Sequence, residues 1–195
     1  MTKRCPWGFK DPGMLEYHDK EWGVPLHDDK KLFELLILEG FQAGLSWSTV
    51  LRKRQAFREA FDNFDPQKVM NYTDKDIERL INNPLIIRNK LKILAAIGNA
   101  RCFKEIQREF GSFNNYIWRF VNDKPRINHF KNFSEMPAET EESKLISEDL
   151  RKRGFRFVGS TICYAFMQAA GLVNDHFVDC FRWKEIQLNY DLKAN

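Results

Sequence analysis

Helical periodicity runs along almost the whole chain and constrains the fold more than any other feature of the sequence. Apolar residues recur at intervals of three and four, which places them on one face of successive amphipathic helices. Capping residues and glycines bound these predicted helices, which are 30–39, 46–61, 73–82, 88–110, 112–121 and 142–153, with a short helix opening at Asp65-Pro66. No segment alternates for long between apolar and polar residues, so strands are expected to be absent or trivial. The sequence therefore predicts an all-α fold.

The length and composition favour one compact unit over residues 1–195. A chain of 195 residues that is 43% hydrophobic can bury one or two small cores. The longest expected loop is 122–140, where two prolines interrupt the apolar pattern. Within this unit we expect two helical lobes, about 1–30 with 140–195 and about 31–140, and we expect a monomer.

Charge and hydropathy indicate which partners and which cellular location fit this sequence. The net charge is only +4, but basic residues cluster at 52–54 and again at 151–153, which fits either a polyanionic partner or solvated helix faces. No apolar run approaches the ~20 residues that span a bilayer, and the N-terminus leads into no apolar signal region. We therefore expect a cytoplasmic protein with no membrane partner.

A glycine-bounded turn of six residues separates two helical patterns near the C-terminus. Its residues are Gly154, Phe155, Arg156, Phe157, Val158 and Gly159. Glycines at both ends allow a tight turn and a close approach to another molecule, and the free N–H groups that open the second helix favour a bound phosphate. An ordinary corner between two helices, with glycine as a C-cap, is the alternative interpretation of this segment.

Cysteine and histidine pairs near the two ends of the chain form a candidate metal site. Cys5 and His18 are 13 residues apart, and the i, i+4 spacing of His176 and Cys180 allows both to project from one helical face. Four such ligands complete a tetrahedron with no open position, so a bound zinc ion would be structural rather than hydrolytic. The spacing also fits an isolated thiol and hydrogen-bonded histidines. The other histidines, His27 and His129, have no cysteine partners and are expected to be surface or packing residues.

An acidic residue at a predicted helix end, Glu39, precedes a glycine-punctuated turn and Trp47. A carboxylate accepts hydrogen bonds from a purine and attracts a cationic one, while flat aromatic rings stack on its faces. The alternative is an exposed terminal charge and a tryptophan in the core.

Motifs along most of the chain resemble those of the 3-methyladenine DNA glycosylase I family, a family of helix-hairpin-helix DNA glycosylases. The resemblance extends from near the start to about Cys180 and rests on the segments 4–7, 17–25, 38–47, 152–159, 166–169 and 171–176. It implies the helix-hairpin-helix glycosylase fold and a structural zinc ion bound by Cys5, His18, His176 and Cys180, which joins the N- and C-terminal segments. The turn 154–159 then corresponds to the hairpin that anchors double-stranded DNA.

The resemblance also implies an activity, the hydrolytic excision of 3-methyladenine from alkylated DNA after the base is flipped. The residues that would contact the base are Glu39, Tyr17, Trp47, Trp7 and Trp22, with Glu39 and Tyr17 in the catalytic role. Water would attack without a dedicated general base, since 3-methyladenine carries a positive charge and is a good leaving group.

Three departures from the family pattern bear on the site. Met14 stands where a pocket tyrosine is expected, and Leu85 replaces an expected glycine at a turn. Asn174 occupies the place of the aspartate that many helix-hairpin-helix glycosylases use, so we expect Asp175 to support the adjacent histidine or a helix cap instead. The segment 181–195 has no assigned role.

Two other functional classes stay open at this point. A binding module could use the hairpin to hold DNA around a degenerate pocket, and the intact Glu39, Tyr17 and Trp47 argue against it. A zinc hydrolase acting on a small molecule would need an open coordination position.

Overall fold

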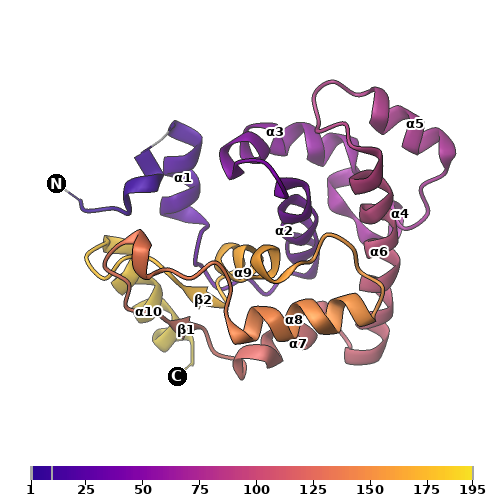
Figure 1. The fold of residues 1–195 in the computed structure, drawn as a ribbon. Coiled ribbons are helices and arrows are strands. Elements are labelled where there is room, and N and C mark those ends of the chain that lie inside the picture. The colour runs from indigo at the N-terminus through magenta and orange to yellow at the C-terminus, as the bar shows by residue number, and fades with distance from the viewer. Residues whose placement is uncertain (1, 10, 195) are drawn as a thin grey trace.

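The structure is a computed structural model that describes the backbone of residues 2–9 and 11–194 and the side chains of residues 2–9 and 11–188. Most of the described chain is helical, which confirms the all-α prediction (Figure 1). The helices are α1 (Pro12–Lys20), α2 (Asp29–Gln42), α3 (Trp47–Ala60), α4 (Pro66–Val69), α5 (Asp74–Asn82), α6 (Lys90–Phe110), α7 (Phe113–Trp118), α8 (Glu141–Lys152), α9 (Ser160–Ala169) and α10 (Phe181–Ala194).

Side-chain caps start the helices where the sequence predicts them. The Ser46 hydroxyl accepts a hydrogen bond from the Thr49 amide ahead of α3. Thr73 forms a capping box with Asp76 ahead of α5. Such local bonds satisfy amide groups that have no partner inside the helix, so these boundaries depend on nearest neighbours alone.

The predicted end of the helix 30–39 at Glu39 is wrong, because α2 continues to Gln42. Gly40 does not stop the helix. It faces the Phe157 side chain so closely that a Cβ would lie 3.4 Å from the Phe157 Cβ. Glu39 therefore lies inside the last turn of α2 rather than at an exposed end.

Two helices have no counterpart among the predicted ones. The first, α1, begins behind Asp11, whose carboxylate accepts a hydrogen bond from the Met14 amide, and has Pro12 in its first turn. The second, α10, occupies the C-terminal segment that the sequence left unassigned, where Ile186 is buried. The Asp-Pro pair is a start signal that could have revealed α1.

The helix α2 lies at the centre of the molecule, beside α9 (Figure 1). The strands, α1 and α10 lie on one side of this pair, and α4, α5 and α6 lie on the other. One hydrophobic core extends from Leu32 to Val173 in sequence, and a small second cluster contains Cys5, Phe177 and Cys180. The division into two lobes stays a prediction.

The predicted loop 122–140 contains one short strand, β1 (Arg126–Ile127), which pairs in parallel with β2 (Val173–Asn174). These two-residue strands fit the expectation that any strands would be trivial. Their pairing places the segment before α8 beside the segment after α9. Just before β2, Gly171 has a φ of +71°, and a Cβ there would overlap the backbone of Val24 and Pro25, so only glycine fits.

Leu85, the departure at a turn, does not strain the backbone. It is absent from the residues with positive φ in the described chain, and its amide donates to the Asn83 side chain. Its side chain is exposed at the surface.

In the part of the chain that the structure describes, no helix is both long and apolar enough to cross a membrane.

Candidate functional site

A cavity of about 230 Å³ opens between α1, α2, α9 and the start of α3. The predicted site residues Trp7, Tyr17, Trp22, Glu39 and Trp47 all line it. The remaining lining residues are Met14, Gln42, Phe133, Met136, Ala165 and Gln168. The structure therefore brings together every residue that was predicted to contact a base, from α1, α2, the start of α3 and the segments on either side of α1.

Glu39 is the carboxylate in this cavity and is only 2% exposed. Its Oε2 atom is buried and has no hydrogen-bond partner. Burial disfavours the charged form and raises the pKa of Glu39 to about 8. The alternative of an exposed charge at a helix end is thus excluded. A buried acceptor without a partner costs folding free energy unless a ligand satisfies it.

Aromatic rings surround this carboxylate. The rings of Tyr17 and Trp47 have centroids 5.3 Å apart, and those of Trp7 and Trp22 are 4.8 Å apart in an edge-to-face arrangement. Burial, followed by the nearby Glu39 carboxylate, raises the pKa of the Tyr17 hydroxyl well above its usual value, so this hydroxyl stays protonated. Flat apolar walls around a polar atom suit a flat, polar-edged ligand.

Met14 lies in the cavity wall, where the resemblance led us to expect a tyrosine. It is 6% exposed and supplies an apolar side chain without a hydroxyl. Met14 therefore fills the place in the wall that was expected for a tyrosine, and the cavity has one hydrogen-bonding group fewer than expected.

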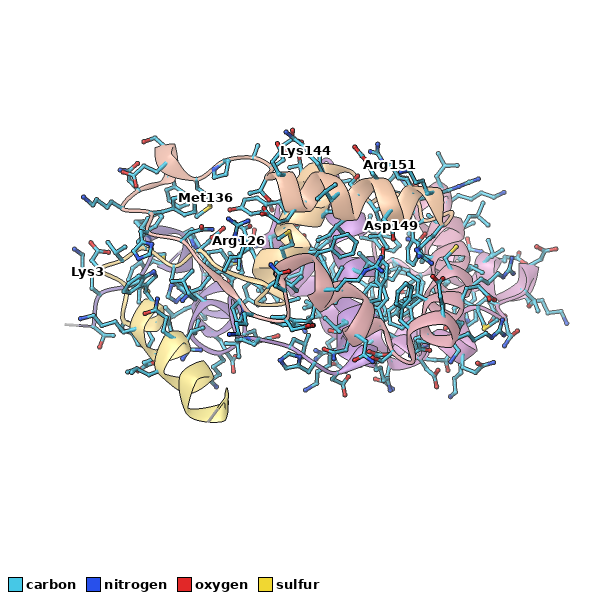
Figure 2. The ribbon with its side chains drawn as sticks, turned by 90° about the horizontal axis from the view of Figure 1, so that it is seen from below. Lys3, Arg126, Met136, Lys144, Asp149 and Arg151 are labelled. Carbon is cyan, nitrogen blue, oxygen red and sulfur yellow. The ribbon has the colours of Figure 1, made fainter. Side chains whose placement is uncertain are left out.

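Sequence reasoning missed several residues of the wall. Phe133 and Met136 come from the loop between β1 and α8, and Gln168 comes from α9. Figure 2 shows Met136 on that loop. The loop residues had no periodic signal, whereas Gln168 lies within one of the family-like segments and could have been singled out.

The four predicted metal ligands also meet, and their ligand atoms lie within 4.8 Å of one another in the buried interior. The Cys180 sulfur lies 3.5 Å from His18 Nε2 and 3.6 Å from His176 Nδ1, and the Cys5 sulfur lies 3.6 Å from the same Nδ1 atom. Zinc–sulfur bonds of about 2.3 Å and zinc–nitrogen bonds of about 2.0 Å place S and N ligands about 3.5 Å apart in a tetrahedron. The cluster therefore fits a tetrahedral metal ion.

The thiols are also chemically suited to a metal ion. The hydrogen bond that Cys5 donates to Cys180 lowers the pKa of the Cys180 thiol and raises the pKa of the Cys5 thiol, so one sulfur of the pair is a thiolate, the form that binds zinc, and the other holds the shared proton. The prediction that His176 and Cys180 share a helical face is wrong, because both lie in the turn before α10. A tight turn brings side chains four residues apart together as a helix does.

Outer hydrogen bonds orient both histidines. His18 Nδ1 bonds the Asp19 carboxylate at 2.7 Å, and His176 Nε2 bonds the Trp22 carbonyl oxygen at 2.9 Å. These bonds leave the other nitrogen of each ring facing the cysteines, as in known metal sites.

Asp175 makes no hydrogen bond of this kind to the histidines. It bonds Tyr164, Gln168 and Asn128, so its expected role beside the histidine or in a helix cap is wrong.

The metal cluster and the cavity share a wall. Trp7 packs edge-to-face on His18 at 5.0 Å, and Trp22 packs on His176 at 4.7 Å, measured between ring centroids. Tyr17 directly precedes His18 on α1. A metal ion would therefore hold three of the cavity's aromatic residues through their neighbours. The other two histidines are surface or packing residues as expected: His27 is exposed and stacks on Trp118, and His129 packs against Trp183.

The glycine-bounded turn joins α8 to α9 and is held by side chains from other helices. Buried Asn99 of α6 accepts from the Arg156 amide at 2.8 Å and donates to its carbonyl at 3.0 Å. Ser147 donates to the Val158 carbonyl at 2.6 Å. Phe157 has a φ of +56°, a strained value for a bulky residue that the surrounding contacts maintain. The first turn of α9 lies beside Glu139, which accepts a hydrogen bond from Ser160.

The two basic clusters are less available than the sequence suggested. Arg153 donates to Asp149 and Glu109 and lies over the Phe110 ring, and Arg54 is buried between two glutamates. Neither is a free cation. Arg151 projects from the outer face of α8, away from Asp149 (Figure 2), and together with Lys152 and Arg156 it is exposed next to the turn.

These features define a mostly helical protein with an aromatic, carboxylate-containing cavity beside a helix-turn-helix corner. Residues 7–183 match the family described as methyladenine glycosylase. The DNA-3-methyladenine glycosylase 1 of Escherichia coli (strain K12) is 51% identical over 178 residues, which cover 91% of this chain and 95% of that protein. The chain therefore belongs to the methyladenine glycosylase family of enzymes.

Solved structures agree with this assignment. A crystal structure of a 3-methyladenine DNA glycosylase I superposes with a TM-score of 0.89 at 48% identity and covers 92% of this chain and 98% of that one. A tyrosine-to-phenylalanine variant of such an enzyme, crystallised in complex with 3-methyladenine, gives a TM-score of 0.88 at 40% identity and covers 91% and 96%.

Proposed function

We propose that the protein repairs alkylated DNA by base excision, hydrolysing the N-glycosidic bond of 3-methyladenine after the base has been flipped into the cavity. The observation that supports this most is the unpartnered Oε2 of Glu39 among aromatic rings. Relatives of at least 40% identity are named for the same base. A flipped base read by hydrogen bonds and stacking needs a cavity of this kind.

In this proposal Glu39 provides the selectivity. Methylation at N3 makes the adenine cationic, and a cation that enters the cavity favours ionised Glu39. The carboxylate then accepts a hydrogen bond from the adenine edge, with the base stacked between Trp47 and neighbouring rings and oriented by Tyr17. Ordinary adenine carries no charge and gains no such attraction.

Water attacks the sugar without a dedicated general base. Asn174, at the place of the usual aspartate, is fully buried, where it donates to the Trp183 carbonyl and accepts from the His176 amide. Asp175 is also fully buried and is bonded to three donors. Both side chains are held by the fold, which supports a reaction driven by the cationic leaving group and by selective binding of the transition state.

The turn 154–159 is proposed to hold a backbone phosphate of duplex DNA. Its exposed cations, Arg151, Lys152 and Arg156, add attraction that does not depend on base sequence. The buried cluster of Cys5, His18, His176 and Cys180 is proposed to hold one structural zinc ion, which supplies cross-linking and no reaction chemistry. The monomeric state and the cytoplasmic location stay predictions.

The proposed function is tested by the release of free bases from methylated duplex DNA, resolved by chromatography. Liberation of 3-methyladenine with 7-methylguanine left in the DNA is the expected result. A folded protein that binds DNA but releases no base would instead be a binding module, and this proposal would be wrong.

The pH dependence of excision is expected to report Glu39. Because the pKa of Glu39 is about 8, the empty cavity holds mostly the neutral acid at pH 6, so kcat/KM for 3-methyladenine should rise about tenfold per pH unit and level off above pH 8. The measurement is single-turnover excision from a duplex with one lesion. The Glu39→Gln variant should show no such rise, and a rise that survives in it would assign the titration to another group.

The double variant Lys152→Ala with Arg156→Ala is expected to weaken duplex binding equally for all sequences. Each lost phosphate contact should reduce the slope of log affinity against log salt by about 1. Binding titrations on unmodified duplex at several salt concentrations measure this slope. Lys75→Ala on α5 is the matched control and should leave it unchanged. A constant slope in the double variant would remove the turn from the DNA interface.

A further inference from the structure

Gln168 lines the cavity from α9, and its amide is held in one orientation. Nε2 donates to Asp175 Oδ2 at 2.8 Å and lies 3.3 Å from the Met136 sulfur. Asp175 is fully buried in the segment that follows β2. This carboxylate receives hydrogen bonds, so the NH₂ group rather than the oxygen of Gln168 faces it.

Two further donors anchor Asp175 itself. The Tyr164 hydroxyl donates to Oδ2 at 2.5 Å, and the Asn128 amide donates to Oδ1 at 2.7 Å. Every polar contact made to this carboxylate by the described residues is therefore a donor, which keeps it an acceptor. Because the NH₂ group of Gln168 faces Asp175, its oxygen Oε1 is the atom left for another partner. Its Oε1 accepts no hydrogen bond from any described residue, and this acceptor belongs to a side chain in the cavity wall.

We propose that Gln168 is a specificity-determining residue that accepts one hydrogen bond from the 6-amino group of the flipped adenine, and that Asp175 is its positioning residue. An adenine amino group has two hydrogens, and the cavity wall carries two acceptors: Glu39 Oε2 from α2, which is buried without a partner, and Gln168 Oε1 from the adjacent α9, to which no described residue donates. Guanine has a carbonyl oxygen at this place. Two acceptors facing that oxygen would repel it, so the pair selects adenine lesions over guanine lesions. This inference rests on the proposed function.

The test is the ratio of 3-methyladenine to 3-methylguanine release, measured by kcat/KM on duplexes with single lesions. Gln168→Met keeps the size of the side chain and removes the acceptor. We expect excision of 3-methyladenine to fall about tenfold while excision of 3-methylguanine stays level or rises, so that the ratio falls at least about tenfold. A loss of packing alone would lower both rates together and leave the ratio unchanged, which would overturn the proposal.

Exchanging the partners gives an independent test. In Asp175→Asn, the new side chain can present either its oxygen or its NH₂ group to Gln168. The amide of Gln168 can then adopt either orientation, so the ratio of 3-methyladenine to 3-methylguanine release should fall. The double variant Gln168→Glu with Asp175→Asn restores one donor facing one acceptor and leaves an oxygen toward the cavity, so the ratio should recover. If the ratio recovers no better than in the single variant, Asp175 has no positioning role.

Gln107→Met is the matched control, because Gln107 Nε2 makes the same kind of bond to Asp29 Oδ2, at 2.7 Å, between α6 and α2. Gln107→Met should lower the stability of the protein and leave the ratio of 3-methyladenine to 3-methylguanine release unchanged.

The proposed function and the proposed role of Gln168 would be contradicted by different results. No 3-methyladenine release by the unaltered protein contradicts the proposed function, whereas an active protein whose ratio survives Gln168→Met contradicts only this inference.

Discussion

Glu39→Gln is expected to lower excision of 3-methyladenine at least about 100-fold while the protein stays folded. The substitution keeps the shape of the side chain but removes the negative charge, and a charge-assisted hydrogen bond inside a desolvated cavity is worth far more than one in water. Single-turnover kinetics at pH 8.5 on a duplex with one lesion measure the loss. If both excision and binding of the free base stay unchanged, Glu39 is not the residue that reads the lesion.

The same variant should be more stable than the parent protein at alkaline pH. The pKa of Glu39 is about 8 in the folded protein and near 4.5 when exposed, so the folded state binds more protons between these values and loses stability as the pH rises from about 5 to 8. Removing the group should remove a destabilisation of about 5 kcal/mol at pH 9, because each unit of the difference in pKa corresponds to about 1.4 kcal/mol. Urea unfolding at pH 5 and pH 9 would show it.

Glu34→Gln is the matched control on the same helix. Glu34 is also buried, but it pairs with Arg54 and Arg58 rather than facing the cavity. Its neutralisation leaves a buried guanidinium short of a partner and should destabilise the protein at neutral pH. Opposite signs of the stability change at Glu39 and Glu34 would show that the two carboxylates differ in environment, whereas equal signs would contradict the burial argument for Glu39.

Removal of the proposed zinc ion is expected to lower the Tm by about 10 °C or more and to impair excision as well. Four buried ligands from both ends of the chain depend on one ion, and without it the thiols and imidazoles lose their shared partner. Since Trp7 and Trp22 pack on the two histidines, the cavity wall should loosen with the cluster. Metal analysis, thermal unfolding and base release after treatment with a strong chelator measure the three effects.

Cysteine variants separate metal loss from general damage. Cys180→Ala should reduce bound zinc from about one ion per chain to near none, as expected for a four-ligand site that loses a thiolate. Cys102→Ala removes a half-buried thiol on α6, outside the cluster, and should keep the zinc. A parent protein purified in the presence of zinc that contains no metal would rule out the structural role.

Local sequence determined the helices because their signals act over a few residues. Ser46 starts α3 by accepting a hydrogen bond from the amide three residues on, Thr73 starts α5 through a capping box with Asp76, and the same chemistry at Asp11 would have revealed α1. The spacing of cysteines and histidines singled out the four candidate metal ligands, and the resemblance to the glycosylase family supported them and indicated the cavity aromatics. The four candidate ligands meet because the two ends of the chain come together.

Only the tertiary structure decided how each polar group is used, because that depends on neighbours far away in the sequence. The sequence predicted Arg153 as part of an available basic cluster, but the fold places it against Glu109 and Asp149. The sequence predicted that Asp175 supports His176, but the fold places it against Gln168. The environment of Glu39 is the strongest case. Its residue type is local, but its desolvation comes from rings on other elements, and desolvation sets its pKa and leaves its oxygen without a partner.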